Sequence, residues 1–194
     1  MQQRSVERLE RMLDACARLI DEIGYDGVTT TLIAERAGVA VGSLYQFFPD
    51  KRAVVQALTQ RNLRHFIDAV SERLSTVDPQ NWWDAVDTVF DIYLRMHREL
   101  PGFRQVHFGD VVDPLLMDGA KENDTVIAES LATALRERFG MPSEQIDLPI
   151  AVAVRAGDAV LRLAFRTELN GDPTLVAEAK ELVRGYLVSR LGPI

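Results

Sequence analysis

The chain has 194 residues, of which 47% are apolar and 26% charged, with a net charge of −7, a composition ordinary for a globular protein. No apolar run approaches the roughly 18–20 residues that span a bilayer, and the first residues lack the apolar core of a signal peptide, so we expect a cytoplasmic protein. The single cysteine, Cys16, excludes an internal disulfide, and its three–four spacing with apolar neighbours predicts a buried packing thiol.

The acidic excess lies entirely in the second part of the chain. Residues 1–74 hold 10 basic and 10 acidic side chains, whereas residues 75–194 hold 12 and 19. Fields at a protein surface depend on where the charges are placed, so a neutral N-terminal module can still contact phosphates. The net charge therefore neither establishes nor excludes nucleic acid as a partner.

Helix-period patterns dominate the sequence, and no segment shows the alternation of a strand. Glycines and prolines separate the periodic segments. We expect helices near residues 4–24, 30–37, 41–48, 50–74, 80–99, 103–117, 120–139, 144–169 and 173–191. The fold class is therefore all-α, with about nine helices.

Two short helices near the N-terminus are joined by a tight turn. Thr30 to Ala37 forms the first, and Gly38 stands where a left-handed residue would end it. Val39 and Ala40 then lead directly into the next helix. This is the pattern of a helix-turn-helix unit, whose second helix enters the major groove of DNA.

The helix expected at 41–48 has two different faces when it is stepped at 100° per residue. The apolar face carries Leu44, Phe47 and Phe48. The opposite arc carries Gly42, Ser43, Tyr45 and Gln46. Pro49 then breaks the helix, Asp50 can cap the following one, and Lys51 stands beside its start, where it could meet a phosphate. The polar arc and its flanks predict a DNA-reading surface.

The stretch VTTTLIAERAGVAVGSLYQFFPDK resembles the N-terminal module of tetracycline-repressor-type (TetR) regulators. The shared frame is a threonine run, I-A-x-x-A-G-V, then L-Y-x-x-F, and a following lysine. The resemblance implies a helix-turn-helix DNA-binding domain at 1–60 and a larger ligand-binding and dimerisation domain at 61–194. It also implies DNA contacts from Thr30, Thr31, Val41, Gly42, Ser43, Tyr45, Gln46 and Lys51.

The chemistry of these side chains suggests separate roles. Gln46 is the best candidate for reading a base edge, since a carboxamide pairs bidentately with adenine, and Val41 could pack on a thymine methyl. The phosphate contacts are expected from Thr30, Ser43, Tyr45 and Lys51. Two positions depart from the family pattern: Ala40 replaces a common capping serine, and Phe47 replaces a polar aromatic residue.

The second part of the chain carries large aromatic and sulfur-containing residues that could line an effector pocket. The simpler alternative for each of them is core packing. A metal site from His97, His107, Asp110 and Asp113 matches no strong zinc signature, so we expect no metal and no cofactor. The candidates for ligand binding are Trp82, Trp83, Phe90, Tyr93, Met96, His97, Phe103, His107, Phe108, Met117, Arg155 and Asp158.

The last two expected helices have apolar surfaces that could join two subunits. Residues 148–168 are apolar on most sides, which predicts burial on most sides, and residues 175–191 carry a steady three–four apolar stripe. The family resemblance implies a four-helix dimer interface from these segments. The alternative is that both helices complete the core of the monomer.

We therefore expect a homodimeric, ligand-responsive transcriptional repressor that binds a palindromic operator in double-stranded DNA and is released by a small-molecule effector. We expect no enzyme activity, because the helical spacing brings no Ser–His–Asp arrangement together. The alternative is an all-α small-molecule-binding protein or enzyme with an incidental helix-turn-helix-like corner. Salt-sensitive DNA binding distinguishes the two.

Overall fold

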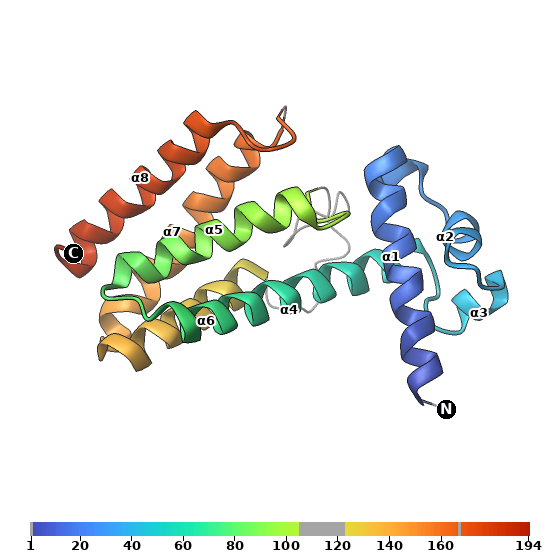
Figure 1. The fold of residues 1–194 in the computed structure, drawn as a ribbon, viewed down its shortest axis with the longest axis horizontal. Helices are drawn as coiled ribbons and strands as arrows, with labels where there is room; N and C mark the ends of the chain where they lie inside the picture. Colours follow the sequence, from blue (N-terminus) through green and yellow to red (C-terminus); the bar gives the residue numbers. More distant parts are fainter. Residues whose placement is uncertain (1, 105–122, 167) are drawn as a thin grey trace. The chain divides into compact units, whose positions relative to one another are not determined.

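The computed structural model describes residues 2–104, 123–166 and 168–194, and every regular element among them is a helix (Figure 1). The eight helices of these residues are α1 (Gln2–Gly27), α2 (Thr30–Ala37), α3 (Val41–Tyr45), α4 (Lys51–Val77), α5 (Trp82–Glu99), α6 (Asn123–Phe139), α7 (Ser143–Ala164) and α8 (Pro173–Leu191). The predicted all-α class is confirmed. The helix expected at 103–117 lies outside the described residues from 105 onward. Among the described helices, none combines the length and the hydropathy needed to cross a membrane.

The chain divides into two compact units. The first is Met1–Arg64 with Glu99–Gly119, and the second is His65–Arg98 with Ala120–Ile194. Helix α4 contributes its first half to the first unit and its second half to the second unit.

The core of the first unit forms around the apolar stripe of α1. Met12, Leu13 and Cys16 are at most 2% exposed and pack with buried residues of α2, α3 and α4. Burial, partly offset by the positive charges of Arg61 and Lys51, raises the pKa of the Cys16 thiol to about 12. The thiol is therefore protonated at neutral pH, and the prediction of a buried packing cysteine is confirmed.

Helix α1 begins earlier and ends later than the segment expected at 4–24. Its regular geometry breaks at Gly24, which has φ 72° and ψ 164°, a combination that glycine adopts without steric cost. The predicted end of the helix thus coincides with this break, and one further helical turn follows it. The Val28 N–H then donates to the Tyr25 carbonyl and leads the chain into α2.

A turn at residues 100–103 packs closely on α1 within the first unit. The Gly102 N–H donates to a carboxylate oxygen of Asp21 at 2.8 Å. Gly102 has φ 74°, and a Cβ at this position would lie 2.9 Å from the Ala17 Cα. Only glycine satisfies both the backbone angle and the close approach. Phe103, the next residue, is completely buried.

In the second unit, α7 and α8 lie side by side (Figure 1). The contact uses Gly157 of α7, where an added Cβ would lie 3.2 Å from the Val183 side chain of α8. Ile150 and Leu187 are fully buried. The close approach of α7 and α8 at Gly157 is therefore made within one chain, and one face of each of these helices completes the monomer core.

Candidate nucleic-acid interface and effector cavity

Hydrogen bonds fix the two ends of α2. The Leu32 N–H donates to the Thr29 hydroxyl oxygen at 3.2 Å, which caps the N-terminus of the helix. At the other end, Gly38 has φ 65° and ψ 41°, the left-handed conformation predicted for it. Ala40 begins α3 without a side-chain cap, as its methyl side chain requires. The predicted helix–turn–helix geometry is confirmed.

The side chains of α3 separate into the two predicted faces. Leu44 is completely buried and Phe48, just beyond the helix, is 6% exposed. On the opposite side, Tyr45 is 51% exposed, and Gln46 and Gly42 are also exposed. The regular helix is shorter than the expected 41–48: it ends at Tyr45, and the N–H groups of residues 47 and 48 both donate to the Leu44 carbonyl.

The polar residues of α2 and α3 meet across the turn. The Thr30 and Tyr45 hydroxyl oxygens lie 3.0 Å apart and share a hydrogen bond. Either hydroxyl can donate, and each keeps lone pairs for a further partner. The contact joins the first residue of α2 to the last residue of α3, and it orients an exposed phenol beside a threonine.

Lys51 is held at the start of α4 by the end of α1. Its ammonium group donates to the Tyr25 carbonyl at 3.0 Å and lies 4.3 Å from the centre of the Tyr25 ring. The adjacent Asp50 carboxylate accepts the Ala53 N–H at 2.9 Å, which confirms the predicted cap of α4. The Lys51 side chain is half-buried, so its charge has a fixed position at the edge of the module.

An ion pair also holds α2 against α1. Both terminal nitrogens of Arg36 donate to the Glu22 carboxylate at 2.8 Å, a bidentate arrangement. The hydrogen bonds from Arg36 lower the pKa of Glu22. Arg11 of α1 adds a hydrogen bond to the Ala37 carbonyl at the end of α2. These contacts orient the helix that precedes α3.

The eight residues proposed from the sequence to contact DNA lie on α2, on α3, just beyond α3 or, for Lys51, at the start of α4. None of them is among the residues of the buried core. The exposed ones are Thr31, Gly42, Tyr45 and Gln46, and the half-buried ones are Thr30, Val41, Ser43 and Lys51. Their contacts with DNA stay a prediction.

Most of the predicted effector-binding residues are buried in the interior of the unit to which they belong. Tyr93 and Asp158 are buried, and the Tyr93 hydroxyl donates to the Asp158 carboxylate at 2.9 Å. Arg162 completes this cluster with an ion pair to Asp158 at 2.9 Å. Burial and the adjacent Asp158 charge raise the pKa of Tyr93 well above its usual value. The His97 ring lies 4.2 Å from the Tyr93 ring and 4.3 Å from that of Phe165, measured between centroids.

The remaining candidates are dispersed. Trp82, Phe90, Met96 and Phe103 are buried, Trp83 is half-buried, and Arg155 is exposed with a terminal nitrogen 3.5 Å from the Thr125 hydroxyl. His107, Phe108 and Met117 lie outside the described residues. Within the described ranges, no group of three or more His, Cys, Asp or Glu side chains could hold a metal ion.

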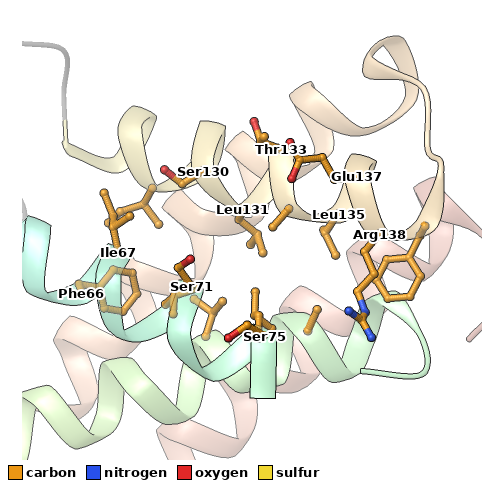
Figure 2. Close-up of a pocket in the computed structure, with 17 residues that line it drawn as sticks. Phe66, Ile67, Ser71, Ser75, Ser130, Leu131, Thr133, Leu135, Glu137 and Arg138 are labelled. Carbon is orange, nitrogen blue, oxygen red and sulfur yellow. The ribbon is translucent and has the colours of Figure 1, made fainter. Parts of the chain in front are cut away.

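The second unit contains a cavity of about 490 Å³ between α4, α5 and α6 (Figure 2). Leu131 and Leu135 of α6 face α4 across it, and Arg138 lies toward one end. None of the effector-binding candidates lines this cavity, so their role stays a prediction. The second half of α4 carries apolar residues and serines that line the cavity. This pattern could have indicated a cavity from the sequence, but a helix face that is exposed to solvent can carry the same mixture of residues.

Comparison with known proteins matches both parts of the chain to one family. Residues 12–58 match the family model described as bacterial regulatory proteins, tetR family. Residues 80–191, more than half of the chain, match the model of the tetracyclin repressor-like C-terminal domain. A TetR-family transcriptional regulator of known structure from Streptomyces coelicolor is 40% identical, with a TM-score of 0.81, over 94% of this chain and 99% of that one.

Other relatives share shorter segments or the fold alone. The repressor KstR of Rhodococcus jostii is 47% identical over 55 residues, which cover 28% of this chain and 26% of KstR. The regulator YvdT of Bacillus subtilis is 30% identical over 43% of this chain and 42% of its own length. The chain thus matches less than half the length of these curated relatives. The fatty acid degradation regulator FadR of Bacillus halodurans, with a TM-score of 0.67 over 91% of this chain and 94% of FadR, is 18% identical and shows the fold alone.

Proposed function

Because this chain belongs to the TetR family of transcriptional regulators, we propose that it is a homodimeric repressor that binds a palindromic operator and is released by a small-molecule effector. Regulators of this family bind DNA and are not enzymes, and this chain is likewise a regulator and not an enzyme. Its domains would be a DNA-binding domain at 1–60 and an effector-binding and dimerisation domain at 61–194. The cytoplasm, where the operator lies, is its proposed location.

The observation that carries the proposal is the exposed polar side of α3. Tyr45 and Gln46 face solvent while Leu44 anchors the helix in the core. A short helix held in this way can enter the major groove with its polar side first. Gln46 would read a base edge, and Tyr45, with Thr30 beside it, would hold a phosphate.

The dimer would form through α7 and α8. Each helix buries one side in its own chain and leaves an apolar stripe exposed: Leu148, Val152 and Leu163 on α7, and Leu182 on α8, are 39–71% exposed. Gly185 continues the α8 stripe, and a Cβ there would touch nothing in this chain. Exposed apolar patches of this kind mark interaction surfaces. A two-fold dimer would present two copies of α3 to one palindrome.

The effector would bind in the second unit and favour a dimer whose two recognition helices no longer match the operator. Coupling between such sites is typically about 1–3 kcal/mol, which corresponds to a several-fold to hundredfold loss of DNA affinity. KstR is a repressor by name, and its resemblance to this chain in the DNA-binding module supports repression as the direction of regulation.

Fluorescence anisotropy with a labelled palindromic fragment from the gene's own promoter region tests this function. We expect specific binding with an affinity that falls steeply as salt rises, because phosphate contacts release counterions. A scrambled fragment of the same length is the control. If both fragments bind equally, or if neither binds at low salt, the proposed function is wrong.

A further inference from the structure

The cavity of the second unit has a mainly apolar lining, and its polar side chains are hydroxyl groups, one carboxylate and one guanidinium. Phe66, Ala85 and Leu131 are buried around it and provide apolar surface from α4, α5 and α6 respectively. Its volume of about 490 Å³ falls within the range of roughly 300–1,000 Å³ that is usual for small-molecule sites. A ligand that fills it must be mainly apolar.

Two hydroxyl groups that line the cavity can offer a ligand only a hydrogen-bond acceptor, because each already donates its own proton to a backbone carbonyl. Ser75 donates its proton to the Glu72 carbonyl at 2.7 Å, and Ser130 donates to the Val126 carbonyl at 2.8 Å. A hydroxyl whose single proton is used in this way keeps lone pairs on its oxygen. These two serines therefore suit a ligand that donates a hydrogen bond, such as an alcohol.

The charged lining residues are Glu137 and Arg138, and the Arg138 guanidinium is already engaged. It forms an ion pair with the Asp78 carboxylate, and its Nε donates to the Pro79 carbonyl at 3.2 Å. Among the described residues that line the cavity, Arg138 is the one with a positive charge. An anionic ligand would have to compete with Asp78 for Arg138, and it would meet the negative charge of Glu137 as well.

We propose that this cavity is the effector site and that it selects an uncharged, mainly apolar molecule with a hydroxyl group, a selection that Asp78 enforces by holding Arg138. The inference rests on the proposed function, since it assumes that the second unit binds an effector. A carboxylate that enters the apolar part of the lining loses its water, and it gains no cationic partner there while Asp78 holds Arg138, so it is disfavoured. A protonated amine is disfavoured beside Arg138 by charge repulsion, and the one anionic partner that the described lining offers it, Glu137, is solvent-exposed.

Calorimetry of the full chain at neutral pH, without DNA, compares 1-decanol, decanoate and decylamine, which share a chain length and differ in charge. We expect decanol to bind at least about tenfold more tightly than either charged probe. Filling the cavity with Ala134→Phe should weaken decanol by at least about tenfold. Decanoate or decylamine binding as tightly as decanol would overturn the inference, as would unchanged decanol binding by the Ala134→Phe protein.

Asp78→Asn tests the selection itself. Asp78 is exposed and has φ 51°, a left-handed angle that asparagine also tolerates, so the substitution removes the charge without straining the backbone. We expect decanoate affinity to rise at least about tenfold while decanol changes less than about twofold. The matched control is Asp147→Asn, which removes the acidic partner of Arg136 on the same helix, a residue that does not line the cavity.

Equal effects of Asp78→Asn and Asp147→Asn on decanoate would refute the role of Asp78. Because these measurements use the protein alone, their outcome is independent of operator binding. A protein that binds decanol in the expected pattern but ignores its promoter would refute the proposed function and not the cavity. A protein that binds its promoter but not decanol would refute the cavity alone.

Discussion

The hydroxyl groups of Thr30 and Tyr45 lie 3.0 Å apart, and this hydrogen bond joins the start of α2 to the end of α3. It is an exposed contact, so its net contribution to stability is about 1 kcal/mol or less. Its position matters more than its energy, because it orients the phenol on the face that we propose meets DNA. The bond therefore links the geometry of the turn to the proposed phosphate contact.

Tyr45→Phe should weaken binding to all DNA sequences alike, by about 1 kcal/mol, because it removes one phosphate contact and no base contact. Thr30→Val should have a similar effect, whereas Thr30→Ser keeps the hydroxyl and serves as the control. Anisotropy titrations on specific and scrambled fragments measure this, with thermal unfolding to check the fold. A loss confined to the specific fragment would contradict the assignment.

Substitutions of Gln46 and of Lys51 should change DNA binding in different ways. Gln46→Ala should relax the preference at one or two base positions, at a cost of about 1–3 kcal/mol on the preferred sequence. Lys51→Ala should weaken every sequence and reduce the slope of affinity against salt by about one. Binding to a panel of singly substituted operators separates the two effects.

Lys51 needs its own control because its ammonium also holds the Tyr25 carbonyl. Lys51→Arg keeps the positive charge, and it should retain most of the salt dependence. If Gln46→Ala and Lys51→Ala change all sequences equally, the division into base and phosphate contacts is wrong.

Leu182→Glu should give monomers and reduce operator affinity by at least about tenfold, because a charge cannot be buried unpaired in a dimer interface. Leu182 is 48% exposed in one chain, so the substitution leaves the monomer core intact. Sedimentation velocity gives the oligomeric state. Val77→Glu, another exposed apolar position at the end of α4, is the control. A Leu182→Glu protein that sediments as a dimer would exclude this interface.

Gly102→Ala should destabilise the chain by about 2 kcal/mol, because it combines a left-handed backbone with a contact of 2.9 Å to the Ala17 Cα. Gly38→Ala is the matched control: it has a similar φ of 65°, and its nearest atom would be 3.9 Å away. Chemical denaturation of both proteins compares the free energies of unfolding. Equal losses would show that the approach to Ala17 contributes nothing.

Local signals in the sequence predicted the recognition module well. Gly38 and Asp50 each fix one helix end, the first through its backbone conformation and the second through its side chain, and such effects can be predicted without knowing the fold. The end of α3 was predicted three residues too late. Pro49 disfavours a helical conformation in the residue before it, Phe48. The regular helix already ends at Tyr45, so this effect does not account for the earlier end.

The cavity of the second unit could not be predicted in the same way. The aromatic residues of α5 gave the strongest signal for a pocket, but Phe90 and Tyr93 are buried in the core of the second unit. The cavity instead depends on how far α6 lies from α4, and no local pattern encodes that distance. The same holds for α8, where Leu182 and Leu187 share one apolar stripe in the sequence, yet only Leu182 is exposed.

The central claim is that two copies of α3 read one palindrome through their exposed polar side. Hydroxyl-radical footprinting of the protein on its own promoter fragment tests it most directly. The account predicts two protected patches of equal strength, related by two-fold symmetry and about one helical turn of DNA apart or adapted to that spacing, both weakened by Gln46→Ala. A single asymmetric patch, or a symmetric pattern unchanged by Gln46→Ala, would contradict it.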